Sequence, residues 1–342
     1  MKKLFTILCL LWSTGLFAQN TDDSYKVMFY NVENLFDTYD DTLIKDEEFL
    51  PEGDRFWSKY KYYQKINNIY KVIIALGEWS PPAIVALSEI ENKKVLTDLV
   101  NNTPLVKYEY KIIHYNSPDR RGIDVAFLYR EDLFEPISSK AIPIHFPKNP
   151  DSKTRDILHV KGIANQSDTL HVFVNHWPSR WGGQLESEER RLFVASVLKQ
   201  KVDSLFNKDT ESNIIITGDF NDYPNNKSIS QILEAKQEFN EVNSTYLYNL
   251  SDYLFKDKNI GSHKYQGAWG VLDQFIVSGN LLMKNNSIST SVDDIYIFNA
   301  DFLLEPDEGY YGFKPYRTFI GYKYQGGFSD HLPIYLILNF TK

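Results

Sequence analysis

Short apolar or alternating stretches recur along the chain, each with the length and residue types of a β-strand. Polar residues follow almost every one of them, where the next turn would begin. Because a rigid sheet holds the side chains at its strand ends in fixed positions, these polar residues are the first candidates for a functional site. The predicted strands are residues 25–30, 84–87, 124–130, 170–174, 213–217, 275–277 and 333–340.

Two longer segments repeat their apolar residues with the helical period. Ser58 can cap a helix that runs to about Leu76, and a second helix is expected over residues 186–206. Many strands with helices between some of them predict an α/β (α+β) fold, a four-layer α/β/β/α sandwich of two packed mixed sheets with outer helices. Turn residues are spread evenly and no linker interrupts them, so residues 19–342 are expected to form one domain.

The first 18 residues have the pattern of a secretory signal peptide. Lys2 and Lys3 precede an apolar run to Phe17, and Ala18 marks the expected cleavage point. A membrane anchor is the alternative, but the run is shorter than the roughly 20 apolar residues of a span, and no later stretch is long enough. The mature protein is therefore expected to be secreted or periplasmic, and cleavage removes the only cysteine, Cys9.

The charge of the chain limits the ways in which it can bind a substrate. The formal net charge is −8, and removal of Lys2 and Lys3 leaves 35 of the 37 basic residues against 45 acidic ones. Such a chain cannot grip nucleic acid by overall charge alone, but it suits a site in which carboxylates surround a cation. No strong interface signal predicts a stable protein partner, so a monomer is expected.

Six polar segments stand at the ends of the predicted strands. Taken alone, each is typical of a turn, because Asn and Asp side chains satisfy the backbone of a turn. Taken together, they supply carboxylates, carboxamides and two histidines in a fixed order along the chain. The segments are residues 31–34, 88–92, 175–180, 218–222, 272–274 and 329–333.

This set of residues, in this order, closely resembles the endonuclease/exonuclease/phosphatase superfamily, which includes deoxyribonuclease I, exonuclease III, neutral sphingomyelinases and inositol polyphosphate phosphatases. The resemblance spans nearly the whole mature chain. The phrases FYNVENLFD (29–37), RGIDVAFLYR (121–130) and NHWPSRWGG (175–183) look like a subgroup of exported bacterial proteins within it. The resemblance implies a metal-dependent phosphodiesterase.

Hydrolysis of an anionic diester benefits from a cation, because the phosphate repels the attacking hydroxide. Asn31 and Glu89 are the best candidate ligands, and the resemblance adds Asp330. Two carboxylates and an amide, with waters in the remaining positions, are typical of a magnesium shell, so Mg²⁺ is the expected cofactor. Mn²⁺ and Ca²⁺ are alternatives, because nothing in the sequence fixes the size of the site.

The attacking water needs a base near neutral pH, and histidine is the natural one. The resemblance assigns this role to His331, with Asp273 orienting its ring, and makes Asp219 the alternative base. It places Asp219 and Asn221 around the water and the phosphate. It also implies that His176 contacts a phosphate oxygen or protonates the leaving group, as in the deoxyribonuclease I branch and unlike in the exonuclease III branch.

Arginine and tryptophan side chains supply candidate substrate contacts, because a guanidinium matches a phosphate and an indole can stack on a base. The alternative is that these side chains are solvated or packed against the core. Asp124 either points at the site or forms a structural ion pair. The predicted substrate contacts are Arg121, Arg180, Trp269 and Arg317, with Arg155 as a further candidate cation.

The fold alone does not fix the substrate. We expect a secreted nuclease that acts on DNA, with RNA as a further substrate. The alternative is a phospholipid (sphingomyelinase-like), small phosphoester or inositol phosphate hydrolase. Docking on a membrane would need an exposed apolar segment, and residues 310–324 come nearest to one. A non-catalytic binding protein is disfavoured, because every group that the chemistry requires is present.

Overall fold

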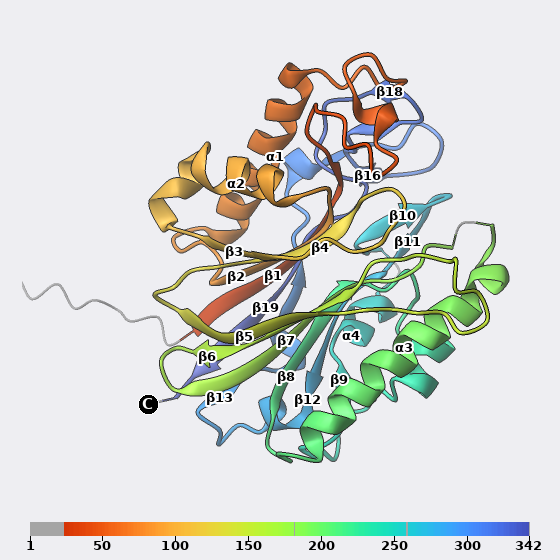
Figure 1. The fold of residues 1–342 in the computed structure, drawn as a ribbon. Helices are drawn as coiled ribbons and strands as arrows, with labels where there is room; N and C mark the ends of the chain where they lie inside the picture. Colours follow the sequence, from red (N-terminus) through yellow and green to blue (C-terminus); the bar gives the residue numbers. More distant parts are fainter. Residues whose placement is uncertain (1–23, 181, 258, 342) are drawn as a thin grey trace, which may run out of the picture.

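The computed structural model describes residues 24–180, 182–257 and 259–341, and the predicted signal peptide lies outside these residues. Two large sheets pack face to face (Figure 1). Helices α1 (Lys59–Gly77) and α2 (Lys93–Asn101) cover the outer face of the first sheet, and α3 (Gln184–Phe206) lies along the outer face of the second. The predicted four-layer sandwich is confirmed.

The first sheet is mixed and contains β1 (Ser24–Leu35), β2 (Ile84–Ile90), β3 (Lys111–His114), β4 (Asp124–Tyr129), β13 (Ile288–Ser289), β14 (Ile295–Ile297) and β19 (Ile334–Phe340). Its order is β13-β19-β1-β2-β4-β3, and β14 also pairs with β19. β1 runs antiparallel to β19 and parallel to β2. The first and last strands of the sheet are therefore neighbours near its middle.

The second sheet contains β5 (Phe134–Ile142), β6 (Ile157–Ala164), β7 (Asp168–His176), β8 (Asn213–Asp219), β9 (Leu247–Asn249) and β12 (Asp273–Ser278). Its order is β5-β6-β7-β8-β12-β9. β7 and β8 are parallel, and the other neighbours are antiparallel. The parallel pair brings the ends of β7 and β8 to the same edge of the sheet.

Small elements fill the connections. The hairpins are β10 (His263–Tyr265) with β11 (Ala268–Gly270), β15 (Leu304–Pro306) with β16 (Phe313–Pro315), and β17 (Phe319–Ile320) with β18 (Lys323–Tyr324). The short helices and helical turns are α4 (Ser251–Lys256), η1 (Glu47–Phe49), η2 (Pro104–Tyr108), η3 (Ser228–Ile232), η4 (Gly279–Leu282), η5 (Val292–Asp294) and η6 (Asp301–Leu303). No helix in the described ranges is long and apolar enough to cross a membrane.

Two apolar clusters hold the layers together. The larger fills the space between the sheets and extends under α1 and α2. The smaller lies between α3 and the second sheet, where Val194 and Leu198 meet Ile214 and Ile216. The expected cap of α1 is present, since Ser58 Oγ accepts a hydrogen bond from the amide of Lys61. Burial of these apolar faces is the main force that stacks the sheets.

The strands run further than the apolar pattern predicts. β7 ends at His176 and β8 at Asp219, because backbone pairing continues through polar residues: Asn175 pairs with Gly218, and His176 with Asp219. The candidate residues thus sit within the last positions of paired strands, where the sheet holds them more rigidly than a loop would.

Candidate active site

Asp219, the last residue of β8, lies at the centre of the predicted site. Its Oδ2 accepts a hydrogen bond from Asn31 Nδ2 at 3.1 Å. The same oxygen lies 3.6 Å from His176 Nε2 and 3.9 Å from His331 Nε2. The register of the second sheet produces this arrangement, since Asp219 pairs with His176 on one side and with Asp273 on the other. Neighbouring strands therefore place these side chains next to one another.

His331 and Asp273 form a buried pair. The distance from His331 Nδ1 to Asp273 Oδ2 is 2.7 Å, which is typical of a charge-assisted hydrogen bond. The bond leaves His331 Nε2 facing Asp219. The backbone on each side is also fixed, because the amide of Asp273 donates to Ser262 Oγ and that of His331 to Ser329 Oγ. The pair has the geometry of a carboxylate that orients an imidazole ring.

Asn221 holds the carboxylate of Asp219 in place. Its amide donates to Asp219 Oδ1 at 2.9 Å, and its Nδ2 donates to the carbonyl oxygen of Trp177 at 3.1 Å. Its φ of 51° is left-handed, a conformation that asparagine tolerates better than most residues. Gly218 precedes Asp219 at a close backbone approach, where an added Cβ would lie 2.2 Å from the carbonyl oxygen of Asn175.

Glu89 turns its carboxylate into the same site from a bulge near the end of β2. Its Oε2 accepts a hydrogen bond from the amide of Asn34 at 2.9 Å. Its Oε1 has only longer contacts among the described residues, to Arg121 Nη2 at 3.7 Å and His176 Nε2 at 3.9 Å. Asn31 Oδ1 accepts one hydrogen bond, from the amide of Glu33. Both oxygens retain lone pairs for a further partner.

The oxygen donors of Asn31 and Glu89 suit a hard divalent cation. Asp330, the third predicted ligand, forms an ion pair with Arg317 at 2.9 Å. Its carboxylate also belongs to a group with His263 and His331 whose possible ligand atoms lie within 4.8 Å of one another. A second group with the same spacing consists of Asp219, Asp273 and His331. The residues fit a divalent cation by donor type, and the predicted ligand set stays a prediction.

Arg317 joins two carboxylates at the rim of the site. Its guanidinium donates to Glu33 Oε1 at 3.1 Å and to Asp330 Oδ2 at 2.9 Å, and 39% of its side chain is exposed. Glu33 also accepts a hydrogen bond from the backbone amide of Thr318, and the buried Lys65 of α1 donates a hydrogen bond to Thr318 Oγ1. β1 and α1 therefore hold the segment that carries Arg317 and leads to Asp330.

The two site histidines carry different charges at neutral pH. Burial lowers the pKa of His331, but the carboxylates of Asp273 and Asp219 outweigh burial and hold this pKa well above its usual range. Burial and the charge of Arg155 hold the pKa of His176 well below its usual range. Burial and the charge of Asp273 raise the pKa of Asp219 to about 7. The site therefore combines a charged imidazole, a neutral imidazole and a carboxylate that titrates near neutrality.

The predicted substrate contacts occupy different environments. Arg121 stands beside Glu89 with 52% of its side chain exposed. Arg180 donates to the carbonyl oxygen of Asn221 at 2.7 Å and to Asn226 Oδ1 at 3.0 Å. Trp269 lies on β11, partly buried, and lines a separate pocket. Arg121 and Arg317 are thus part of the cluster around Glu89 and Asp330, while Arg180 braces the turn after β8.

Arg155 and Asp124 have structural partners. Arg155 is buried and donates to the carbonyl oxygen of His176 and to Asp119 Oδ2, each at 3.1 Å. It supports His176 from the backbone side. The carboxylate of Asp124 lies 3.0 Å from His114 Nε2, which agrees with a structural role for Asp124.

Two residues next to the site carry no sequence motif. His263 packs its ring against His331, with 4.8 Å between the centroids. Lys65 is 1% exposed, although lysine is rarely buried. Its one sequence signal is its place in the apolar stripe of α1, three residues after Tyr62 and one before Ile66.

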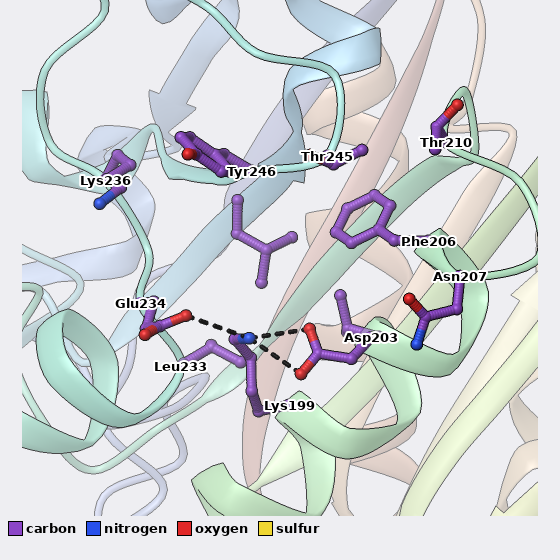
Figure 2. A pocket seen from close by; sticks show the side chains of 12 residues that line it. Lys199, Asp203, Phe206, Asn207, Thr210, Leu233, Glu234, Lys236, Thr245 and Tyr246 are labelled. Carbon is purple, nitrogen blue, oxygen red and sulfur yellow. Dashed lines mark hydrogen bonds and ion pairs between the residues drawn. The ribbon is translucent and has the colours of Figure 1, made fainter.

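The cavity shown in Figure 2 is separate from these residues. It has a volume of about 620 Å³ and lies between α3 and the segment before β9, where Lys199 pairs with Asp203 and Glu234. Leu247 in its wall pairs with Ser278, at the end of β12 opposite to Asp273. At the usual rise of a strand, those two ends of β12 are about 17 Å apart.

Comparisons with known proteins identify the family. Residues 26–340 match the model of the Endonuclease/Exonuclease/phosphatase family. The chain therefore belongs to this family, whose enzymes are metal-dependent phosphoesterases, and the resemblance seen in the motifs is confirmed. A search of curated proteins gave no match.

Solved structures share the fold at low sequence identity. D. rerio TDP2 complexed with single strand DNA product has 14% identity and a TM-score of 0.55, over 93% of this chain and 100% of that chain. The human Nocturnin catalytic domain with bound sulfate has 16% identity and a TM-score of 0.54, over 93% of this chain and 95% of that chain. An endonuclease/exonuclease/phosphatase family protein from Bacteroides thetaiotaomicron has 14% identity and a TM-score of 0.52, over 93% of this chain and 98% of that chain.

Proposed function

We propose that this protein is an exported, divalent-metal-dependent nuclease that hydrolyses phosphodiester bonds in DNA, with RNA as a further substrate. The observation that carries the proposal is the cluster around Asp219 Oδ2, which has Asn31, His176 and His331 within 3.9 Å. The likeness to D. rerio TDP2, solved with a single strand DNA product, supports nucleic acid as the substrate. The pattern of residues 1–18 supports export.

Asn31 and Glu89, with Asp330 as the third ligand, would hold the cation. Mg²⁺, with Mn²⁺ or Ca²⁺ as alternatives, would supply positive charge that offsets the charge of the phosphate. Asp219 and His331 border the space for the attacking water. Because His331 already carries a proton at neutral pH and the pKa of Asp219 is about 7, Asp219 is the group that would take the proton of the water. Asp273 keeps the ring of His331 oriented with its Nε2 toward Asp219 and the space for the water.

The remaining side chains would bind the phosphate. His176 is neutral and can donate from Nε2 to a phosphate oxygen or to the leaving oxygen. Arg121 presents an exposed guanidinium beside Glu89, and Arg317 presents another beside Asp330. Guanidinium groups bind phosphate oxygens in pairs, so both arginines can hold the diester across the site. Asn221 keeps the carboxylate of Asp219 aimed at the water.

The test is a parallel assay on plasmid DNA, RNA, sphingomyelin and bis-p-nitrophenyl phosphate, with Mg²⁺ or Mn²⁺ and with EDTA. Plasmid nicking is expected to stop with EDTA and with His331→Ala. Tyr246→Ala, in the cavity of Figure 2, is the matched control and should retain activity. Hydrolysis of sphingomyelin or the small diester alone would move the enzyme to the lipid or small-phosphoester class. No hydrolysis of any diester would refute the proposal.

A further inference from the structure

A second pocket lies beside the candidate active site, and of the predicted substrate contacts it contains Trp269. It has a volume of about 670 Å³, within the range of small-ligand sites. It is formed by the β10–β11 hairpin and by residues 299–313. Its lining includes the side chains of Trp269, Tyr310, Phe313, Asn259, Gln266 and Asn299.

The β10–β11 hairpin is the wall between this pocket and His331. His263 of β10 forms a backbone bridge with His331, and Leu332, the next residue, lines the pocket. Lys264 and Trp269 pair across the hairpin and also line the pocket. Because successive side chains of a strand point to opposite faces, His263 faces the site while Lys264 and Trp269 face the pocket. The site and the pocket therefore lie on opposite sides of one hairpin.

The pocket wall contains a lysine whose charge is already neutralised. The side chain of Lys264 is 3% exposed, and its Nζ forms an ion pair with Asp307 at 2.9 Å. The same ammonium donates to the carbonyl oxygens of Tyr311 and Phe313, each at 3.0 Å. The pocket lining, among the described residues, includes no other lysine or arginine. The pocket therefore suits an uncharged group better than a phosphate, which needs a cation.

Aromatic rings form the apolar surface of the pocket. Trp269 packs partly against the core, which restrains its ring, while Tyr310 and Phe313 are 51% and 57% exposed. Gly267, at the tip of the hairpin, has a φ of 82°, and an added Cβ there would lie 2.7 Å from the ring of Tyr310. The glycine thus allows this ring to approach the hairpin. Exposed rings around a concave surface suit a flat aromatic ligand.

Three carboxamides complete the lining. Asn259, Gln266 and Asn299 are exposed, so their carboxamide groups are open to solvent and available to a ligand in the pocket. A carboxamide both donates and accepts hydrogen bonds, as the edge of a nucleobase does. A surface that docks on a membrane would gain nothing from three carboxamides in a concavity, nor from a lysine that is sequestered.

We propose that this pocket binds a base of a single-stranded nucleic acid substrate, beyond the hairpin from the phosphate held at His331. The inference rests on the proposed nuclease function and adds a site that favours a polymer over a small diester. The rings of Trp269 and Tyr310 stack on the base, and the carboxamides contact its edge. A lipid surface is the competing occupant and is an outcome of the test.

The experiment compares oligothymidylate, an abasic oligonucleotide of the same length, and bis-p-nitrophenyl phosphate as substrates. One stacked base changes affinity by roughly 5- to 150-fold. Trp269→Ala and Tyr310→Ala should therefore lower kcat/KM for oligothymidylate by such a factor relative to the small diester. The wild type should prefer oligothymidylate to the abasic chain, and the variants should lose this preference. Tyr310 is exposed, so Tyr310→Ala keeps the test valid if Trp269→Ala unfolds.

Tyr246→Ala removes an exposed tyrosine from the cavity of Figure 2 and should keep the wild-type preference. Equal hydrolysis of the oligothymidylate and the abasic chain by the wild type would overturn the base pocket and leave the nuclease function standing. Hydrolysis of the small diester with every nucleic acid intact would refute both. Binding to phosphatidylcholine vesicles that Trp269→Ala abolishes would overturn the base pocket in favour of lipid.

Discussion

Replacement of Asp273 by Asn tests whether this buried carboxylate positions His331. The hydrogen bond measures 2.7 Å, and the side chain of Asp273 is 1% exposed, so solvent cannot substitute for it. A hydrogen bond to a charged group contributes about 1.5–3 kcal/mol. Each 1.4 kcal/mol corresponds to a tenfold change in rate, so kcat for bis-p-nitrophenyl phosphate should fall roughly 10- to 150-fold.

The assay measures kcat and KM across a pH series at saturating Mg²⁺, together with thermal unfolding. A positioning role predicts that kcat falls while KM changes little. The charge of Asp273 raises the pKa of both Asp219 and His331, so Asp273→Asn should move the acid limb of the pH profile to lower pH. Asp203→Asn makes the same chemical change in the Lys199 pair of Figure 2 and is the control. A loss of kcat below about threefold in a folded variant would refute the reasoning.

Three further predictions concern the metal and stability. Glu89→Gln should weaken Mg²⁺ binding, measured by calorimetry, about tenfold or more, because a carboxylate ligand is lost. Unchanged affinity would exclude Glu89 as a metal ligand. Gly218→Ala should lower the free energy of unfolding in urea by about 2–4 kcal/mol, because the Cβ meets a backbone oxygen; an unchanged midpoint would contradict this. Burial raises the pKa of Glu91 from 4.5 to about 8. Between these pH values the carboxyl group is protonated in the folded chain and ionised in the unfolded chain, so stability falls as pH rises through this range to about 8. Glu91→Gln should therefore raise Tm more at about pH 9 than at about pH 5; an equal change at both would disprove the buried charge.

The central strands could be predicted from the sequence because both of their faces are buried. β8 is a nearly continuous apolar run, which predicts a strand over residues 213–217. The β5–β6 hairpin was not predicted, because β5 has polar residues such as Ser138, Ser139 and Lys140 on a largely exposed strand. Its pairing depends on register with β6, which no local pattern encodes.

The site could be predicted in outline, because the chemistry requires particular residue types in a particular order. The roles of the individual arginine side chains could not be predicted. Arg121 and Arg180 are equally plausible phosphate contacts in the sequence, yet Arg180 donates to the carbonyl oxygen of Asn221 while Arg121 stays half exposed beside Glu89. Only the fold decides which guanidinium has backbone partners. The contacts of Lys65 could not be predicted for the same reason, since its partners come from a segment more than 250 residues away.

The pairing of β1 with β19 links the order of synthesis to the order of folding. β1 leaves the ribosome long before β19, yet the two strands are neighbours from Ser24 opposite Asn339 to Phe29 opposite Ile334. Contacts so distant in sequence form slowly. β19 begins three residues after His331, so docking of this last strand completes the anchoring of the segment that carries the histidine. Under the proposed function, a half-made chain would therefore be harmless to the messenger RNA that encodes it.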